Sequence, residues 1–169
     1  MLMSAVERFA TWPVAALLFI VFVFCNQGFE WRSNILAYNM RFLDMRYWYT
    51  PEDAYRLLSE LGSKGRRIYA ATELTLDLLF PFVYGSLLAI LMVHLQENSR
   101  CALLPLTAAL ADWAENITIV YLISNYEERP SPVAWLGAVC TATKWTLLLI
   151  STMVILIGAA TGIMYPVQP

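Results

Sequence analysis

Charged side chains are scarce in this sequence, and that scarcity excludes an ordinary water-soluble domain. Lys, Arg, Asp and Glu together make up 14% of the 169 residues, whereas 59% of the residues are hydrophobic. A soluble domain typically carries about 25% charged residues, which cover its water-facing surface. The composition therefore predicts an integral membrane protein, and the length favours a single transmembrane domain over residues 1–169.

The sequence also has few of the residues that bind metals, cofactors or nucleic acids. It contains one histidine and three cysteines, Cys25, Cys101 and Cys140, which form no CxxC pair. Its formal net charge is −2, so it lacks the basic surface that nucleic acid requires. No Walker lysine loop, HExxH or GxSxG motif occurs in it. We therefore expect no metal, no cofactor and no nucleic-acid partner, and we expect the lipid bilayer to surround the chain.

Four apolar runs are each long enough to cross the hydrocarbon core of a bilayer, which is about 30 Å thick. They cover about residues 12–29, 68–93, 102–123 and 133–160. The first run is longer than the core of a secretory signal and lacks a small-residue cleavage site, so we expect it to be retained. The predicted fold class is all-α: an integral membrane four-helix bundle with a structured, partly helical loop between the first two spans.

Pro81 lies near the middle of the second run. A proline has no N–H to donate within a helix, so a kink is expected there. A neighbouring helix must then satisfy the carbonyl that the proline leaves free.

The loop at about residues 30–67 is the only polar stretch of any length. From Trp31 to Trp48, basic residues are interleaved with aromatic and aliphatic ones. This pattern predicts an amphipathic helix, which lies in the lipid headgroup zone or packs on the end of the bundle. A second helix is predicted to begin at Thr50 and Pro51, a capping residue followed by a proline, and to end at Gly62.

The orientation of the chain follows from the basic residues near the spans. The loop at 30–67 holds seven Lys and Arg residues, whereas the N-terminal tail and the turn between the second and third spans hold only Arg8 and Arg100. The positive-inside rule therefore predicts a cytoplasmic loop, with both termini on the opposite side of the membrane.

Ionisable residues interrupt the three apolar runs after the first. A charged side chain near the bilayer centre costs at least about 2.5–3.5 kcal/mol, so such residues are expected to face the bundle interior and find partners. Residues three or four apart share one helix face. At about 1.5 Å per residue, Asp77, Glu115 and Lys144 fall at a similar depth. The predicted ligand-binding site consists of Glu73, Asp77, Tyr84, Asp112, Glu115, Asn116 and Lys144.

The charges in this predicted site do not balance. Four carboxylates face the single Lys144, which leaves an excess of three negative charges. Either some carboxylates hold a proton at neutral pH, or a bound cation compensates them, or Arg66 and Arg67 do so from the rim of the bundle.

Three functions are compatible with the cluster. We favour the binding of a small apolar or lipid-like ligand, or of a cation, against the acids. The first alternative is a membrane-embedded enzyme of isomerase, cyclase or lyase type that acts on a lipid or isoprenoid substrate. In that enzyme Asp77 and Glu115 are the candidate acid and base, and Lys144 tunes one of them. The second alternative is an accessory or structural subunit whose charges only hold the helices together.

Overall fold

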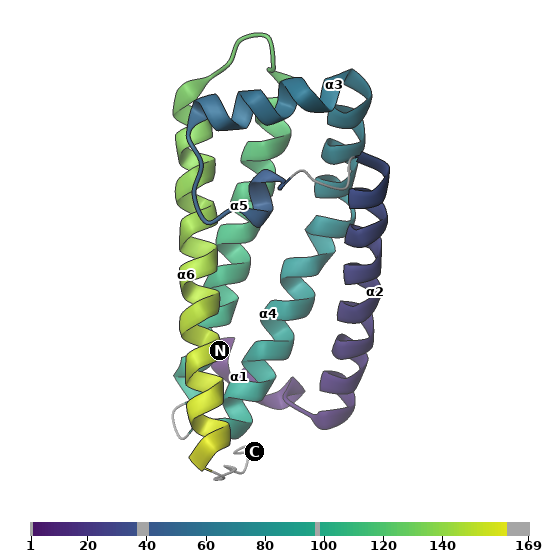
Figure 1. The fold of residues 1–169 in the computed structure, drawn as a ribbon. Helices are drawn as coiled ribbons and strands as arrows, with labels where there is room; N and C mark the ends of the chain where they lie inside the picture. Colours follow the sequence, from purple (N-terminus) through teal and green to yellow (C-terminus); the bar gives the residue numbers. More distant parts are fainter. Residues whose placement is uncertain (1, 37–40, 97–98, 162–169) are drawn as a thin grey trace.

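The computed structural model describes residues 2–36, 41–96 and 99–161, and over these residues the protein is all-helical (Figure 1). The α-helices are α1 (Leu2–Phe9), α2 (Trp12–Leu36), α3 (Pro51–Leu74), α4 (Leu76–Leu95), α5 (Leu103–Ser124) and α6 (Ser131–Thr161). Two short 3-10 turns, η1 (Leu43–Met45) and η2 (Ser99–Ala102), lie in the connections. The predicted all-α class is confirmed for the described residues.

Among the described residues, four helical stretches are long and apolar enough to cross a membrane: Trp12–Leu36, Pro51–Leu95, Arg100–Ser124 and Ser131–Thr161. They run side by side, and α1 lies at the same end of the molecule as the last turns of α6 (Figure 1). The first part of α3 lies across the opposite end (Figure 1). Helix α2 starts where the first apolar run starts but continues to Leu36, beyond the predicted end near residue 29.

The predicted amphipathic helix over residues 31–48 is wrong for the described residues. Residues 31–36 continue α2, and residues 41–50 contain no α-helix, only the single turn η1. Residues 37–40 lie outside the described residues. The physical reason is that Arg32 is buried against carboxylates of the interior instead of lying at the surface of a separate helix.

The start of α3 and its turn at Gly62 follow the local sequence signals. The Thr50 hydroxyl accepts a hydrogen bond from the Asp53 N–H at 3.2 Å, and the Asp53 carboxylate accepts one from the Thr50 N–H at 3.1 Å. This reciprocal capping box satisfies two N–H groups that a helix start leaves free. At Gly62 the backbone leaves the helical conformation, with φ 63° and ψ −179°. There α3 turns from the end of the molecule into the direction of the other helices (Figure 1).

The second apolar run is divided at Thr75 and not at Pro81, where the kink was expected. Thr75 has φ −122° and ψ −81° and separates α3 from α4. Pro81 lies inside α4, which continues through it. The chain therefore changes direction six residues before the proline, and Asp77 falls in the first turn of the new helix.

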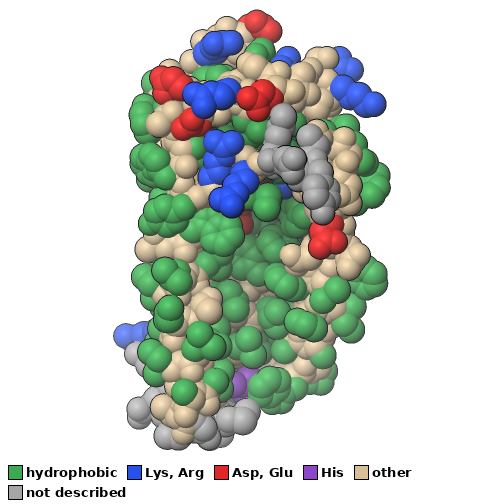
Figure 2. Space-filling view, in the orientation of Figure 1, with side chains coloured by type: hydrophobic (Ala, Val, Ile, Leu, Met, Phe, Trp, Pro, Cys, Tyr) green, Lys and Arg blue, Asp and Glu red, His purple; other side chains and the backbone are tan. Residues whose placement is uncertain are grey.

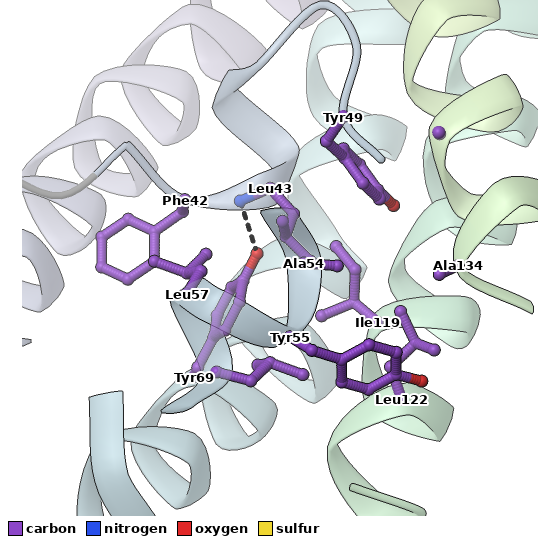
Figure 3. Close-up of a cluster of buried hydrophobic side chains, with 12 residues drawn as sticks. Phe42, Leu43, Tyr49, Ala54, Tyr55, Leu57, Tyr69, Ile119, Leu122 and Ala134 are labelled. Atoms are coloured by element: carbon purple, nitrogen blue, oxygen red, sulfur yellow. Dashed lines mark hydrogen bonds between the residues drawn. The ribbon is translucent and has the colours of Figure 1, made fainter. Parts of the chain in front are cut away.

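Two apolar clusters form the core, one toward each end of the helices. The first joins residues 42–49 to α3, α5 and α6, and within it the Tyr69 hydroxyl accepts a hydrogen bond from the Leu43 N–H at 3.2 Å (Figure 3). The second packs α2 and α4 against the turn η2 and includes Ala15, Ile90 and Met92. The buried charged residues lie between these clusters.

We predict that Gly62→Ala destabilises the fold by about 1–3 kcal/mol, because its φ and ψ belong to a region that essentially only glycine adopts. A Cβ atom at Gly62 would meet no atom within 4 Å, so the loss of stability would come from backbone strain and not from a steric clash. Thermal unfolding in detergent measures it, with the exposed Ser63→Ala as the control. Equal unfolding temperatures for Gly62→Ala and the parent would contradict this prediction.

Candidate functional site

Lys144 of α6 forms ion pairs with two carboxylates of α5. Its Nζ lies 3.0 Å from Asp112 Oδ1 and also contacts Glu115 Oε2. The Thr141 hydroxyl, one turn earlier on α6, donates a hydrogen bond to Glu115 Oε1. The Tyr84 hydroxyl of α4 donates to Asp112 Oδ2 at 2.8 Å. This half of the cluster thereby ties α4, α5 and α6 together.

Arg32 forms the second half of the cluster, whereas the sequence pattern predicts that it lies in the loop. Its guanidinium lies 3.1 Å from Asp44 Oδ2 and 3.4 Å from Glu73 Oε1, and it is only 2% exposed. A signal for this position exists in the sequence. Cys25, Phe29 and Arg32 are spaced four and three apart, so Arg32 lies on the same face of the first apolar helix as Cys25.

Asp44 connects the two halves, and it too was missed in the sequence. Its carboxylate pairs with Arg32 and accepts a hydrogen bond from the Tyr69 hydroxyl at 2.8 Å. Its backbone carbonyl accepts hydrogen bonds from Lys144 Nζ at 3.3 Å and Trp145 Nε1 at 3.2 Å. Burial alone raises the pKa of the Asp44 carboxyl. The charges of Arg32 and Lys144, together with the Tyr69 hydroxyl, outweigh burial and hold this pKa below its usual range.

The acid excess expected from the sequence remains in the structure. Among the described residues, the buried cluster holds five carboxylates, Asp44, Glu73, Asp77, Asp112 and Glu115, against the two cations Arg32 and Lys144. Arg66 and Arg67 do not compensate them. Arg66 donates to the Leu58 carbonyl at 3.0 Å and lies 3.8 Å from the centre of the Tyr126 ring, and Arg67 is exposed. A proton or a bound cation must therefore balance the remaining acids.

One group of these acids has the spacing of a cation site. Single carboxylate oxygens of Asp44, Glu73 and Asp77 all lie within 4.8 Å of one another. The Arg32 guanidinium already pairs with two of the three residues, Asp44 and Glu73. Asp77 is the member that Arg32 does not reach.

Two side chains of α5 hold the turn of α4 that carries Asp77. Asn116 Nδ2 donates to the Asp77 backbone carbonyl at 2.7 Å, and Trp113 Nε1 donates to the Leu78 carbonyl at 2.8 Å. The Asp77 carbonyl is the acceptor, four residues before Pro81, that the proline leaves without a donor. The expectation that a neighbouring helix satisfies this carbonyl is confirmed, and Asn116 is thereby placed against the site.

A groove of about 900 Å³ runs between α2, α4 and α6 and ends at the charged cluster. Figure 2 shows it as a hollow on the face between α6 and α2, lined mainly by hydrophobic side chains. At its far end the ring of Trp12 stacks on that of His94, with centroids 4.6 Å apart. From Trp12 to Arg32 the groove follows α2 for about 30 Å, at about 1.5 Å per residue. Its apolar wall includes Trp12, Phe19, Phe22, Phe29, Phe80, Leu87, Leu88, Leu91 and Leu148.

The groove separates the seven predicted site residues into two groups. Four of them line it: Asp77, Tyr84, Asp112 and Lys144. Arg32 and Asp44 line it as well. The other three, Glu73, Glu115 and Asn116, are buried and do not line the groove. Glu115, a candidate catalytic residue, is 0% exposed and is held by Lys144 and Thr141.

No protein-family model, curated protein or solved structure matches this chain. The function is therefore inferred from the groove and the charges at its end. Both features are built from residues that are far apart in the sequence and come together through the packing of α2, α4, α5 and α6.

We predict that Lys144→Met destabilises the protein by about 3–5 kcal/mol, because it leaves Asp112 and Glu115 buried without their cation. The double substitution Lys144→Met with Glu115→Gln should recover part of this loss. Thermal unfolding in detergent measures both effects, and the exposed Lys64→Met serves as the control. Simple additivity of the Lys144 and Glu115 substitutions would contradict the pairing.

We also predict that Asn116 and Pro81 are energetically coupled. Asn116→Ala should cost about 1–3 kcal/mol, because the buried Asp77 carbonyl loses its donor. In a Pro81→Ala background the loss should be smaller, because the substituted alanine supplies a backbone N–H to that carbonyl. A double-mutant cycle of unfolding free energies measures the difference.

Asn125→Ala is the matched control for this cycle. Asn125 donates a side-chain hydrogen bond to the Tyr121 carbonyl at 2.9 Å, at the end of α5. The loss of unfolding free energy caused by Asn125→Ala should be the same with or without Pro81. The coupling is refuted if Asn116→Ala also costs the same in both backgrounds.

Proposed function

We propose that this protein is a multi-pass membrane protein that binds an elongated, mainly apolar, lipid-like molecule in the groove between α2, α4 and α6. The observation that carries the proposal is the groove itself, about 900 Å³ in volume, apolar along its length and charged at one end. Ligand pockets span roughly 300–1,000 Å³ and pair apolar walls with a few placed polar groups. The ligand's tail lies along α2, and its polar end lies at Asp77 and Asp112.

The outward-facing side chains support placing this groove within a bilayer. Large apolar residues such as Phe24, Ile117 and Ile157 are 71%, 70% and 65% exposed, whereas the charged cluster is enclosed. Apolar side chains are stable in contact with lipid hydrocarbon, whereas charged side chains exposed to it cost free energy. A groove whose opening faces the lipid tails admits a lipid-like molecule sideways, without passage through water.

Ligand binding accounts for the charges better than helix packing alone does. Packing explains the pairs of Arg32 and Lys144, since each ties helices together. It does not explain Asp77, a carboxylate that lines the groove and forms no ion pair among the described residues. Proton transfer between Asp77 and Glu115 is less well supported, because Glu115 does not line the groove.

We predict that filling the groove removes a co-purifying lipid. Ala16 of α2 lines the groove, so Ala16→Trp should occupy the space of the ligand's tail. The measurement is mass spectrometry of the organic extract of protein purified from its native membranes. We expect the parent to retain an apolar molecule at about one per chain and Ala16→Trp to retain several-fold less.

Ala159→Trp is the matched control, because Ala159 is an exposed residue of α6 that does not line the groove. It should retain as much of the molecule as the parent, and all three proteins should unfold at similar temperatures. Identical extracts from Ala16→Trp and the parent would rule out the groove as the binding site.

A further inference from the structure

We propose that the ligand of this groove carries a positively charged amine at its polar end and that the Asp77 carboxylate binds this amine. The inference rests on the proposed function and names the chemical class of the ligand's head. It follows from which charged groups at the end of the groove are already paired, from the sign of the remaining charge, and from the rings beside Asp77.

Every charged group that lines the groove, except Asp77, already has a partner within the protein. Arg32 pairs with Asp44 and Glu73, and Lys144 pairs with Asp112 and Glu115. Asp77 is only 4% exposed and lines the groove, and its carboxylate has no hydrogen bond or ion pair among residues 2–36, 41–96 and 99–161. A buried carboxylate aimed at a cavity without a partner is costly unless a donor or a cation enters that cavity.

The remaining charge selects the sign of the ligand's head. Five buried carboxylates against two cations favour an incoming positive charge over a negative one. An anionic head would have to displace Asp44 from Arg32 or Asp112 from Lys144 before it found a cation. Glu73 further favours a positively charged head, because its Oε2 atom is buried and has no hydrogen-bond partner among the described residues.

An organic amine fits this place better than a bare metal ion. A metal shared by Asp44, Glu73 and Asp77 would compete with the Arg32 guanidinium, which already pairs with the first two. An amine needs only the Asp77 carboxylate, and the apolar part of the same molecule continues along the groove. Its ammonium group donates up to three hydrogen bonds to oxygen atoms at that end.

Aromatic rings line the groove beside Asp77. Phe80 lies one turn after Asp77 on α4 and contacts Phe29 of α2 edge-on, with ring centroids 5.1 Å apart. The Tyr84 ring follows one turn later and lies 5.3 Å from that of Phe80. A cation near the faces of such rings is attracted by their quadrupoles, most strongly where water is excluded.

The test compares three probes with the same chain length and different heads: dodecylamine, dodecanol and dodecanoate. The full-length protein is embedded in nanodiscs of neutral phosphatidylcholine, and saturable binding of radiolabelled dodecylamine is measured against protein-free nanodiscs. Each unlabelled probe then competes. We expect dodecylamine to compete at concentrations at least tenfold lower than dodecanol or dodecanoate.

Substitutions locate the effect at Asp77. Asp77→Asn should weaken dodecylamine binding at least tenfold and leave competition by dodecanol little changed, whereas Asp77→Glu should retain the preference for the amine. Glu60→Gln, the same acid-to-amide change at an exposed position of α3, should change nothing. The comparison of the three probes on the unsubstituted protein tests the sign of the head even where a variant does not fold.

The outcomes separate the two proposals. Equal competition by the three probes, or a preference for dodecanoate, overturns the amine inference and leaves a lipid-like ligand in place. An amine preference that survives Asp77→Asn overturns the assignment to Asp77. The absence of saturable dodecylamine binding overturns the amine inference, and together with an unchanged extract from Ala16→Trp it overturns the proposed function itself.

Discussion

A charge enclosed among apolar helices must have a partner of opposite sign, and the path of this chain follows from that requirement. Lys144 ties α6 to α5, and Arg32 ties α2 to the end of α3. Asp44, which lies between α2 and α3, contacts both cations. Its carboxylate pairs with Arg32, and its backbone carbonyl accepts a hydrogen bond from Lys144. The same residues that stabilise the helices against one another also close one end of the groove.

The position of the excess carboxylates indicates which of them is available to a ligand. An ion-pair network that served packing alone would gain nothing from an additional carboxylate, because an unpaired buried charge is destabilising. Here the carboxylate without an ion pair among residues 2–36, 41–96 and 99–161, that of Asp77, lies on the groove wall, and α5 holds its turn through Asn116 and Trp113. A carboxylate in this position can pair with a group that enters the groove, which is the basis of the proposed ligand site.

The interior residues of the three later spans were predictable because periodicity and insertion cost act on each helix separately. Asp112 and Lys144 sit on the interior faces of their helices for that reason, and the structure joins them at 3.0 Å. The sequence pattern places Arg32 and Asp44 in the loop, because basic residues interleaved with aromatic and aliphatic ones predict an amphipathic helix in the headgroup zone or on the end of the bundle. The local sequence pattern does not predict that the chain folds back so that Asp44, twelve residues later, pairs with Arg32.

The sequence by itself determined the class of this protein: its shortage of charge and its four long apolar runs leave an all-helical chain that can cross a membrane, with acids and a lysine among the helices. Only the tertiary structure decided which of these acids have partners, and that Asp77, which has none among the described residues, lies on the wall of the groove. The physical reason is that burial cost is a property of single residues, whereas pairing and cavity shape depend on distances between helices. Lys144 reaches Asp112 and Glu115, whereas Asp77 has no ion pair within the part of the chain that the structure describes, a difference set by the packing of α4 against α5 and α6.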